Sequence, residues 1–191
     1  MPDVEVIVVD SLSNDNTAAL SRGIADTVIE LRCSATRARL IGAEKARGTL
    51  VLNLDADQEL VPGVLERAVN LGLPAVAFGE LSEGRGIVAR ANRLQNRVTG
   101  LEWRRQINPI GGSIVPRLYQ RSLLLRGLRA IPPTIMDLTP MPYAEDSLLF
   151  AGTGLSEDRV GFVGSAIIHH ELDSVWAYWK KWVRNGQIAK S

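Results

Sequence analysis

The amino-acid sequence predicts an α/β protein, with an open, mostly parallel sheet and helices on both faces. Two apolar runs, Glu5–Val9 and Gly48–Leu54, have the length and the aliphatic content of buried strands. Both runs are followed by an aspartate, Asp10 and Asp55, then by polar residues and a helical pattern. Strands that alternate with helices are typical of sheets whose ligands lie beyond the carboxyl ends of the strands.

Further elements continue this alternation. The loop at 11–17 is rich in turn-forming and helix-capping side chains, which predicts that a helix begins after it. Pro62 stands at a favourable first-turn position of another helix. We expect strands at 5–9, 27–31, 48–54, 74–81 and 159–168, and helices at 18–25, 36–47, 62–71, 86–98 and 173–190. The pattern loosens from about Thr99 to Asp146, as it does in binding loops and lids.

Composition narrows the class of protein. The hydrophobic content of 46% and the charged content of 23% are ordinary for a globular protein. A net charge of +1 gives no argument for a nucleic-acid partner. The single cysteine, Cys33, cannot form an internal disulfide, and the first residues lack the features of a signal peptide. These observations favour a cytoplasmic protein.

Asp55 and Asp57 form the first candidate site. Carboxylate oxygens are the hard ligands that Mg²⁺ and Mn²⁺ prefer, and these ions keep positions open for substrate phosphates. A solvated loop is the alternative, because two acids at this spacing are common by chance. The predicted topology favours a site, since Asp10 would lie at the same edge of the sheet.

A second acidic pair, Glu145-Asp146, stands directly before an apolar segment that we expect to be helical. A favourable interaction with the helix dipole is the simpler explanation of such a pair. The alternative is a general base, a deprotonated carboxylate that removes a proton from an attacking hydroxyl.

The order of these motifs resembles family 2 of the inverting glycosyltransferases, which have the GT-A fold. The matching segments are 8–17, 38–42, 54–57, Glu145-Asp146, and His170 with the basic helix after it. The resemblance implies transfer of a sugar from a nucleoside-diphosphate sugar, with UDP favoured, to an acceptor hydroxyl, without a covalent enzyme intermediate. The implied acceptor is a surface glycan or a lipid-linked precursor, as in polysaccharide biosynthesis, and the implied cofactor is Mg²⁺ or Mn²⁺.

The resemblance also implies roles for single residues. The positions that match nucleotide-binding residues are Asp10, Ser11, Asp15, Arg39 and Asp55. The metal would be held by Asp57 with Asp55, and Asp146 would be the catalytic base, with Glu145 beside it. We accordingly expect one domain over 1–191, with a nucleotide-binding half at 1–98, an acceptor and catalytic half at 99–172 and an amphipathic helix at 173–191.

The sequence departs from the family pattern at its start. Family members carry a strand and a Pro/Asn-containing loop before the strand that Glu5–Val9 matches. We therefore expect a gap in the sheet beside that strand. Ser11 and Leu40 also stand where many members have aspartate and asparagine.

His169 and His170 would point to opposite faces of a strand, so one ion cannot easily take both. His170 has the better spacing for the histidine that joins the metal shell in some members, and it is our expected ligand. A histidine packed inside the protein is the alternative.

Basic and aromatic residues suggest two further contacts. Arg104, Arg105 and Arg117 lie in the loose region and could hold a diphosphate or an anionic acceptor. The last helix combines Trp179 and Trp182 with basic residues. It either packs its aromatic stripe on the domain or meets anionic lipid at the inner face of a membrane.

Two other classes stay open. A nucleotidyltransferase uses a related sheet and metal-binding acids, but the glycine-rich basic loop expected after its first strand is not visible. A non-catalytic remnant that binds nucleotide weakly or not at all is the second. The presence of Asp55, Asp57 and Asp146 together argues against it.

Overall fold

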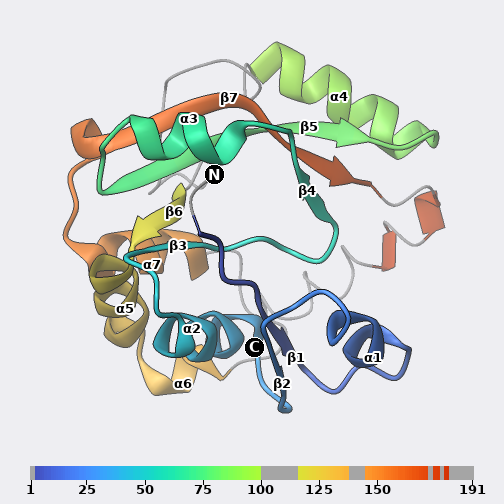
Figure 1. The fold of residues 1–191 in the computed structure, drawn as a ribbon. Helices are drawn as coiled ribbons and strands as arrows, with labels where there is room; N and C mark the ends of the chain where they lie inside the picture. Colours follow the sequence, from blue (N-terminus) through green and yellow to red (C-terminus); the bar gives the residue numbers. More distant parts are fainter. Residues whose placement is uncertain (1–2, 100–115, 138–144, 172–173, 177–178, 181–191) are drawn as a thin grey trace.

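The computed structural model describes residues 3–99, 116–137, 145–171, 174–176 and 179–180. Its strands form two sheets (Figure 1). In the smaller sheet, β1 (Ile7–Asp10) pairs with β2 (Thr27–Glu30). The larger sheet has the order β3 (Leu50–Leu52), β6 (Pro116–Gln120), β5 (Ala75–Glu83), β7 (Val160–His170) and β4 (Gln58–Leu60).

Helices alternate with most of these strands, so the predicted α/β class is confirmed. They are α1 (Thr17–Ser21), α2 (Ala35–Lys45), α3 (Val64–Asn70), α4 (Ile87–Thr99), α5 (Arg121–Ala130), α6 (Pro133–Met136) and α7 (Glu145–Thr153). A 3₁₀ turn at Glu157–Arg159 precedes β7. The helices expected at 18–25 and 62–71 are shorter than predicted.

The expectation of a mostly parallel sheet is wrong for the larger sheet. Only β5 and β7 run parallel there, whereas β3–β6, β5–β6 and β4–β7 are antiparallel pairs among the described strands. Every antiparallel pair includes β4 or β6, the two strands that the sequence pattern did not predict. Both strands are short and have no apolar pattern of their own. They are strands because they pair with the longer strands β5 and β7.

The division into two sheets matches the expected gap. Among the described strands, β1 pairs with β2 alone, and β3 pairs with β6 alone. Ile7–Val9 and Leu50–Leu52 are apolar on both faces, as in strands of a covered sheet, yet each of these residues is only half-buried. Among the described strands, β1 and β3 are therefore edge strands, as β2 and β4 are at the other ends of the two sheets.

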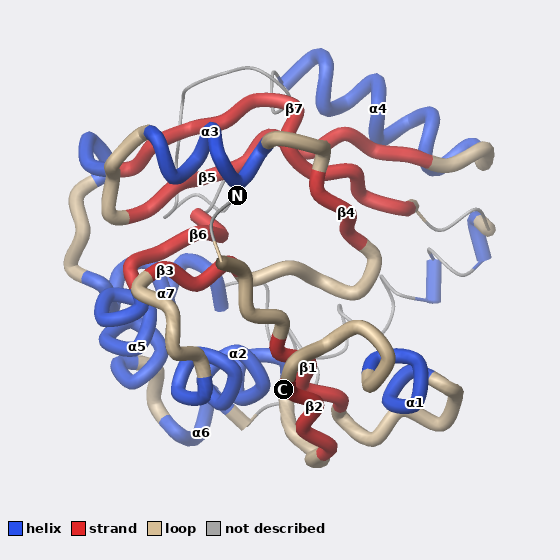
Figure 2. The backbone as a smooth tube through the Cα atoms, in the orientation of Figure 1, coloured by secondary structure: helices blue, strands red, loops and turns tan. Residues whose placement is uncertain are grey.

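Helices cover both faces of the larger sheet (Figure 2). Val76 and Phe78 of β5 pack with α3 on one face, and Ala75 and Ala77 face the opposite way, toward α2, α5 and α7. Tyr119 of β6 lies at 0% exposure in this second cluster. The helices that contain Arg39 and Asp146, α2 and α7, pack in this second cluster.

The region expected to be irregular, from about Thr99 to Asp146, contains β6, α5 and α6. Gly127 obscured the helical pattern of α5. A Cβ atom there would lie 2.5 Å from the carbonyl oxygen of Leu149, so the close approach of α5 to α7 requires glycine. Arg104 and Arg105 lie outside the described residues.

Most of the expected final helix also lies outside the described residues, including Trp182. The rings of Trp176 and Trp179 stack with centroids 4.7 Å apart, and their exposed fractions are 60% and 50%. No helix within the described ranges is both long and apolar enough to cross a membrane.

Candidate active site

A tight turn between β3 and β4 presents the first acidic motif. The amide of Gln58 donates to the carbonyl of Asp55 over 3.1 Å. The Asp55 amide donates in return to Oε1 of the Gln58 side chain over 3.2 Å. The turn lies where the sequence predicted it, just after a strand, and it holds Asp55 and Asp57 outside the sheet.

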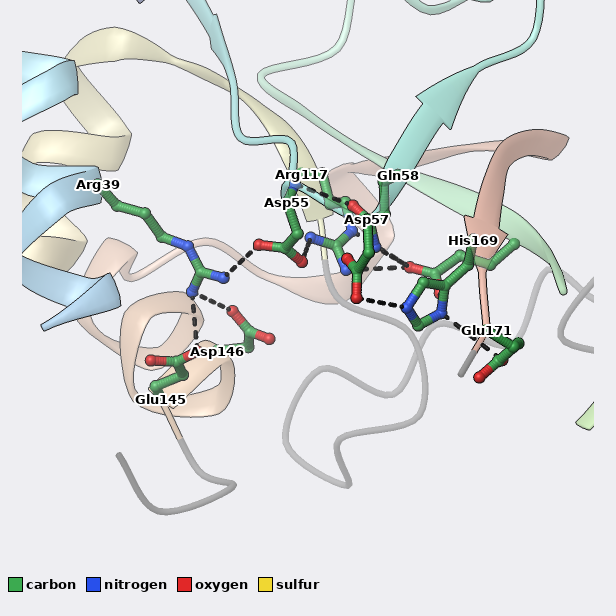
Figure 3. Close-up of polar contacts among 10 residues, drawn as sticks. Arg39, Asp55, Asp57, Gln58, Arg117, Glu145, Asp146, His169 and Glu171 are labelled. Carbon is green, nitrogen blue, oxygen red and sulfur yellow. Dashed lines mark hydrogen bonds and ion pairs between the residues drawn. The ribbon is translucent and has the colours of Figure 1, made fainter. Parts of the chain in front are cut away.

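Arg39 of α2 joins this turn to the second acidic motif (Figure 3). Its Nη2 atom lies 3.1 Å from Oδ1 of Asp55. Its Nη1 atom lies 3.1 Å from Oε1 of Glu145 and 3.2 Å from Oδ1 of Asp146, at the start of α7. One guanidinium group thereby contacts three acids that the sequence predicted as site residues.

Arg117 of β6 is a second cation at the turn. Its Nη1 atom lies 2.9 Å from Oδ2 of Asp55, so each oxygen of that carboxylate faces an arginine. Its Nη2 atom lies 3.0 Å from Oε1 of Glu80, on β5. The Arg117 side chain is 14% exposed, which makes these ion pairs partly shielded from water.

The ion pairs control how these groups titrate. Burial acts to raise the pKa of Asp55, but the charges of Arg117 and Arg39 outweigh it and hold that pKa below its usual value of 3.8. Burial acts to lower the pKa of Arg39, and the negative charges of Asp146, Glu145 and Asp55 raise it instead. Asp55 and Arg39 therefore both stay charged at neutral pH.

Asp146 behaves differently from Asp55. Burial raises its pKa above the usual value of 3.8, Arg39 acts in the opposite direction, and Glu145 adds to the rise. A carboxylate with a raised pKa is a stronger proton acceptor than an ordinary aspartate. The neighbouring Glu145 accepts a hydrogen bond from Oγ1 of Thr36 over 2.7 Å, which fixes its side chain on α2.

The side chain of His169, rather than that of His170, lies beside the acidic turn, although the His170 amide donates to the Asp57 carbonyl over 2.8 Å. Its Nε2 atom is 3.1 Å from Oδ2 of Asp57, and this hydrogen bond is the main reason that the pKa of His169 is raised. The ring of His170 faces Glu59 and Glu83 instead, so the histidine ring that lies beside Asp57 is that of His169 and not that of the expected ligand, His170. The two rings do point to opposite sides of the strand, as expected.

The loop after β1 is ordered by its own side chains. Asp10 is 4% exposed and accepts hydrogen bonds from the amide and the hydroxyl of Ser13. Ser11 donates to the carbonyl of Cys33 over 2.7 Å, and Asp15 accepts from the Thr17 amide over 2.9 Å. In the described chain these acids shape a loop at the end of β1, and they make no contact with the Asp55 turn.

The donor atoms around Asp57 suit a hard divalent cation in their chemistry. Asp57 is 49% exposed at its side chain, and an imidazole nitrogen stands beside it, an O/N set that Mn²⁺ accepts. As the side chains lie, no group of three or more His, Cys, Asp or Glu residues within the described ranges is arranged around a common point. Within the described ranges, Asp57 and His169 form a neighbouring oxygen and nitrogen pair that could hold a metal.

Glu80, Gln58 and Glu171 are polar residues of the site that the sequence did not predict. Gln58 lies in the short strand β4, which no pattern indicated. Glu80 did carry a signal, because it is an acid inside the otherwise apolar run 75–81. Charged side chains are rarely buried in strands without a partner.

Comparison with known proteins gives a family over part of the chain. Residues 1–72 match the sequence model of glycosyl transferase family 2. No curated protein matches the sequence.

Solved structures show the same fold. The chain superposes on S. aureus TarS 1–349 in complex with UDP at a TM-score of 0.61 and 20% identity, covering 87% of this chain and 51% of that one. TarS 1–349 without a stated ligand gives 0.61 and 19%, with the same coverage. Its complex with UDP-GlcNAc gives 0.60 and 19%, covering 89% of this chain and 50% of that chain. The chain thus has a GT-A fold and spans about half the length of these structures.

Proposed function

From the family 2 glycosyltransferase sequence in residues 1–72 and the GT-A fold, we propose that the chain transfers a sugar from a nucleoside-diphosphate sugar to an acceptor hydroxyl. The observation that carries the proposal is the position of Arg39, in contact with Asp55, Glu145 and Asp146. These residues are far apart in sequence. Their convergence puts a candidate base beside a candidate diphosphate site.

Asp146 is the proposed general base. It accepts the proton of the acceptor hydroxyl, whose oxygen attacks the anomeric carbon from the face opposite the leaving nucleoside diphosphate. One carbon–oxygen bond forms as the other breaks, so the sugar inverts and no enzyme intermediate forms. Burial supports this role, because it raises the pKa of Asp146.

Charge favours a diphosphate bound together with a cation. Acids outnumber arginines at the site, which contains Asp55, Asp57, Glu80, Glu145, Asp146 and Glu171 beside Arg39 and Arg117. A diphosphate alone would be repelled by this balance. Arg39 and Arg117 are the cations that could turn toward phosphate oxygens, which guanidinium groups bind in two-pronged contacts.

Asp57 and His169 would hold Mg²⁺ or Mn²⁺. A cation bound there offsets the negative charge that develops on the leaving diphosphate. Asp57 is the more exposed acid of the turn, at 49% against 39% for Asp55.

We further propose UDP as the nucleotide of the donor and a glycan or lipid-linked saccharide as the acceptor. S. aureus TarS has been solved in complex with UDP and with UDP-GlcNAc. The exposed Trp176 and Trp179 support contact with a membrane surface, because tryptophan is favoured at lipid headgroups. A lipid-linked acceptor would be presented at that surface, at the cytoplasmic face.

Turnover tests this proposal. UDP-GlcNAc, UDP-Glc and UDP-Gal are incubated with the chain and Mn²⁺, with water as the acceptor hydroxyl, and UDP release and the anomeric form of the released sugar are followed by NMR. We expect wild type to release UDP and a sugar of inverted configuration. Asp146→Asn should lose this activity. Asp158→Asn, a change in the exposed 3₁₀ turn, is the control and should retain it. Pyrophosphate release from UTP and a sugar phosphate would instead identify a nucleotidyltransferase.

A further inference from the structure

We infer that Glu80 is a positioning residue that links Asp55 and Asp57, the two acids of the turn. This inference rests on the proposed function of the site. Glu80 lies on β5, and its side chain is 30% exposed. It contacts three side chains, Arg117, His169 and Gln58, and each of the three also contacts the turn.

The link to Asp55 runs through one guanidinium group. Oε1 of Glu80 accepts from Nε and Nη2 of Arg117 over 3.3 and 3.0 Å. Nη1 of the same group donates to Oδ2 of Asp55 over 2.9 Å. Because the guanidinium group is planar and rigid, holding one of its edges on Glu80 fixes the direction in which Nη1 points.

The link to Asp57 runs through one imidazole. Oε2 of Glu80 lies 3.8 Å from Nδ1 of His169, whose Nε2 atom lies 3.1 Å from Oδ2 of Asp57. A carboxylate facing one ring nitrogen orients the other, as it does for histidines at metal centres. Glu171 lies at the same distance from Nδ1, 3.8 Å, and shares this task.

Gln58 provides the third connection. Its Nε2 atom lies 3.4 Å from Oε1 of Glu80, and its own Oε1 accepts from the Asp55 amide over 3.2 Å. Glu80 therefore restrains the backbone of the turn as well as both carboxylates. A residue that served only as the partner of Arg117 would need none of the contacts to His169 and Gln58.

The test is Glu80→Gln, which keeps the size of the side chain and removes its charge. Glu83→Gln is the matched control, because Glu83 lies on the same strand and its exposed side chain faces His170 instead. Calorimetry with UDP and Mn²⁺ gives the half-saturating Mn²⁺ concentration at a temperature where all variants are folded. We expect Glu80→Gln to raise the half-saturating Mn²⁺ concentration about tenfold or more, as loss of an orienting partner does at metal sites. Glu83→Gln should leave this concentration unchanged. Equal values for Glu80→Gln and wild type would overturn the inference.

A second measurement separates this inference from the proposed function. The free energies of unfolding of wild type, Glu80→Gln, Arg117→Gln and the double variant form a double-mutant cycle, which needs no ligand. The linkage predicts that the double variant loses less stability than the sum of the two single losses. If wild type binds no UDP with Mn²⁺, the proposed function fails, and additive losses in the cycle would separately refute the linkage.

Discussion

Arg39 and Asp146 are in contact, with Nη1 of the arginine 3.2 Å from Oδ1 of the aspartate. The two residues come from α2 and α7, which lie on the same face of the sheet. The contact places the proposed base next to the arginine that also holds Asp55. Most properties that we predict for the site follow from this arrangement.

Asp146→Asn should lower the rate of sugar transfer about a thousandfold, within the range expected for loss of a general base. Asparagine has nearly the same shape but cannot accept the proton. UDP binding should remain within a few-fold of wild type. Measuring turnover and UDP affinity on the same sample checks both parts, and full activity in Asp146→Asn would exclude this residue as the base.

The pH dependence of transfer should carry the signature of Asp146. Its pKa is raised above 3.8 by burial, so the base becomes protonated at a higher pH than an exposed aspartate would. kcat/KM should therefore fall as the pH falls through this raised pKa. Arg39→Gln removes the charge that opposes the rise, and the acid limb should move to higher pH. An acid limb that stays in place would contradict the pairing of Arg39 with Asp146.

Arg39→Gln should also destabilise the fold. The Arg39 side chain is 15% exposed, and its loss leaves Asp55, Glu145 and Asp146 without a shared cation. Because Asp55 and Asp146 are more than a third exposed, we expect a cost of about 2 kcal/mol, below that of a fully buried pair. Arg129→Gln, at an exposed pair with Glu44, is the control and should cost less than about 1 kcal/mol. Urea titrations measure both.

Gly127→Ala should destabilise the crossing of α5 and α7 by about 2 kcal/mol, since overpacking forces the helices apart. The added Cβ would lie 2.5 Å from the Leu149 carbonyl oxygen and 2.9 Å from Cγ2 of Thr153. Gly42→Ala in α2 is the control, because its Cβ would meet Val9 at an ordinary 3.7 Å. That change should raise helix stability by about 0.5–1 kcal/mol. Thermal unfolding distinguishes the two, and similar shifts would refute the close crossing.

The stacked Trp176 and Trp179 predict weak, reversible binding to anionic vesicles. Their exposure, with Lys180 5.4 Å from the centre of the Trp176 ring, fits a surface that meets headgroups and negative charge together. Cosedimentation with phosphatidylglycerol vesicles should decrease in the Trp176→Ala/Trp179→Ala variant. If the wild-type chain does not sediment with these vesicles, the membrane proposal is wrong.

The sequence predicted the parts of the site that have strong local patterns. Asp55 follows a continuous apolar strand, and Glu145-Asp146 stands at the beginning of a helix, so their places in the fold were evident. The contact between the two motifs was not evident from the sequence, because it depends on how α2 and α7 each pack against α5. Only tertiary packing brings residues from distant segments to one guanidinium group.

The elements that the sequence did not predict have a common cause. β4 is three residues long and is a strand only because it pairs with β7. That pairing also decides which histidine faces the turn. His169 is the direct partner of Gln58, so the two side chains share a face, and His170 takes the other. Register between strands is a long-range property, and spacing along the chain does not fix it.

Calorimetric titration of UDP in the presence of Mn²⁺, with wild type and Asp57→Ala side by side, tests the central claim most directly. Asp57 lies at the turn beside His169 and is half-exposed, so its loss should remove the metal-dependent part of binding and leave the fold intact. We predict metal-dependent UDP binding by wild type, weaker binding of GDP and dTDP, and no binding of UDP by Asp57→Ala. Equal UDP affinity for the two proteins, or none in either, would contradict a nucleotide-sugar site at these acids.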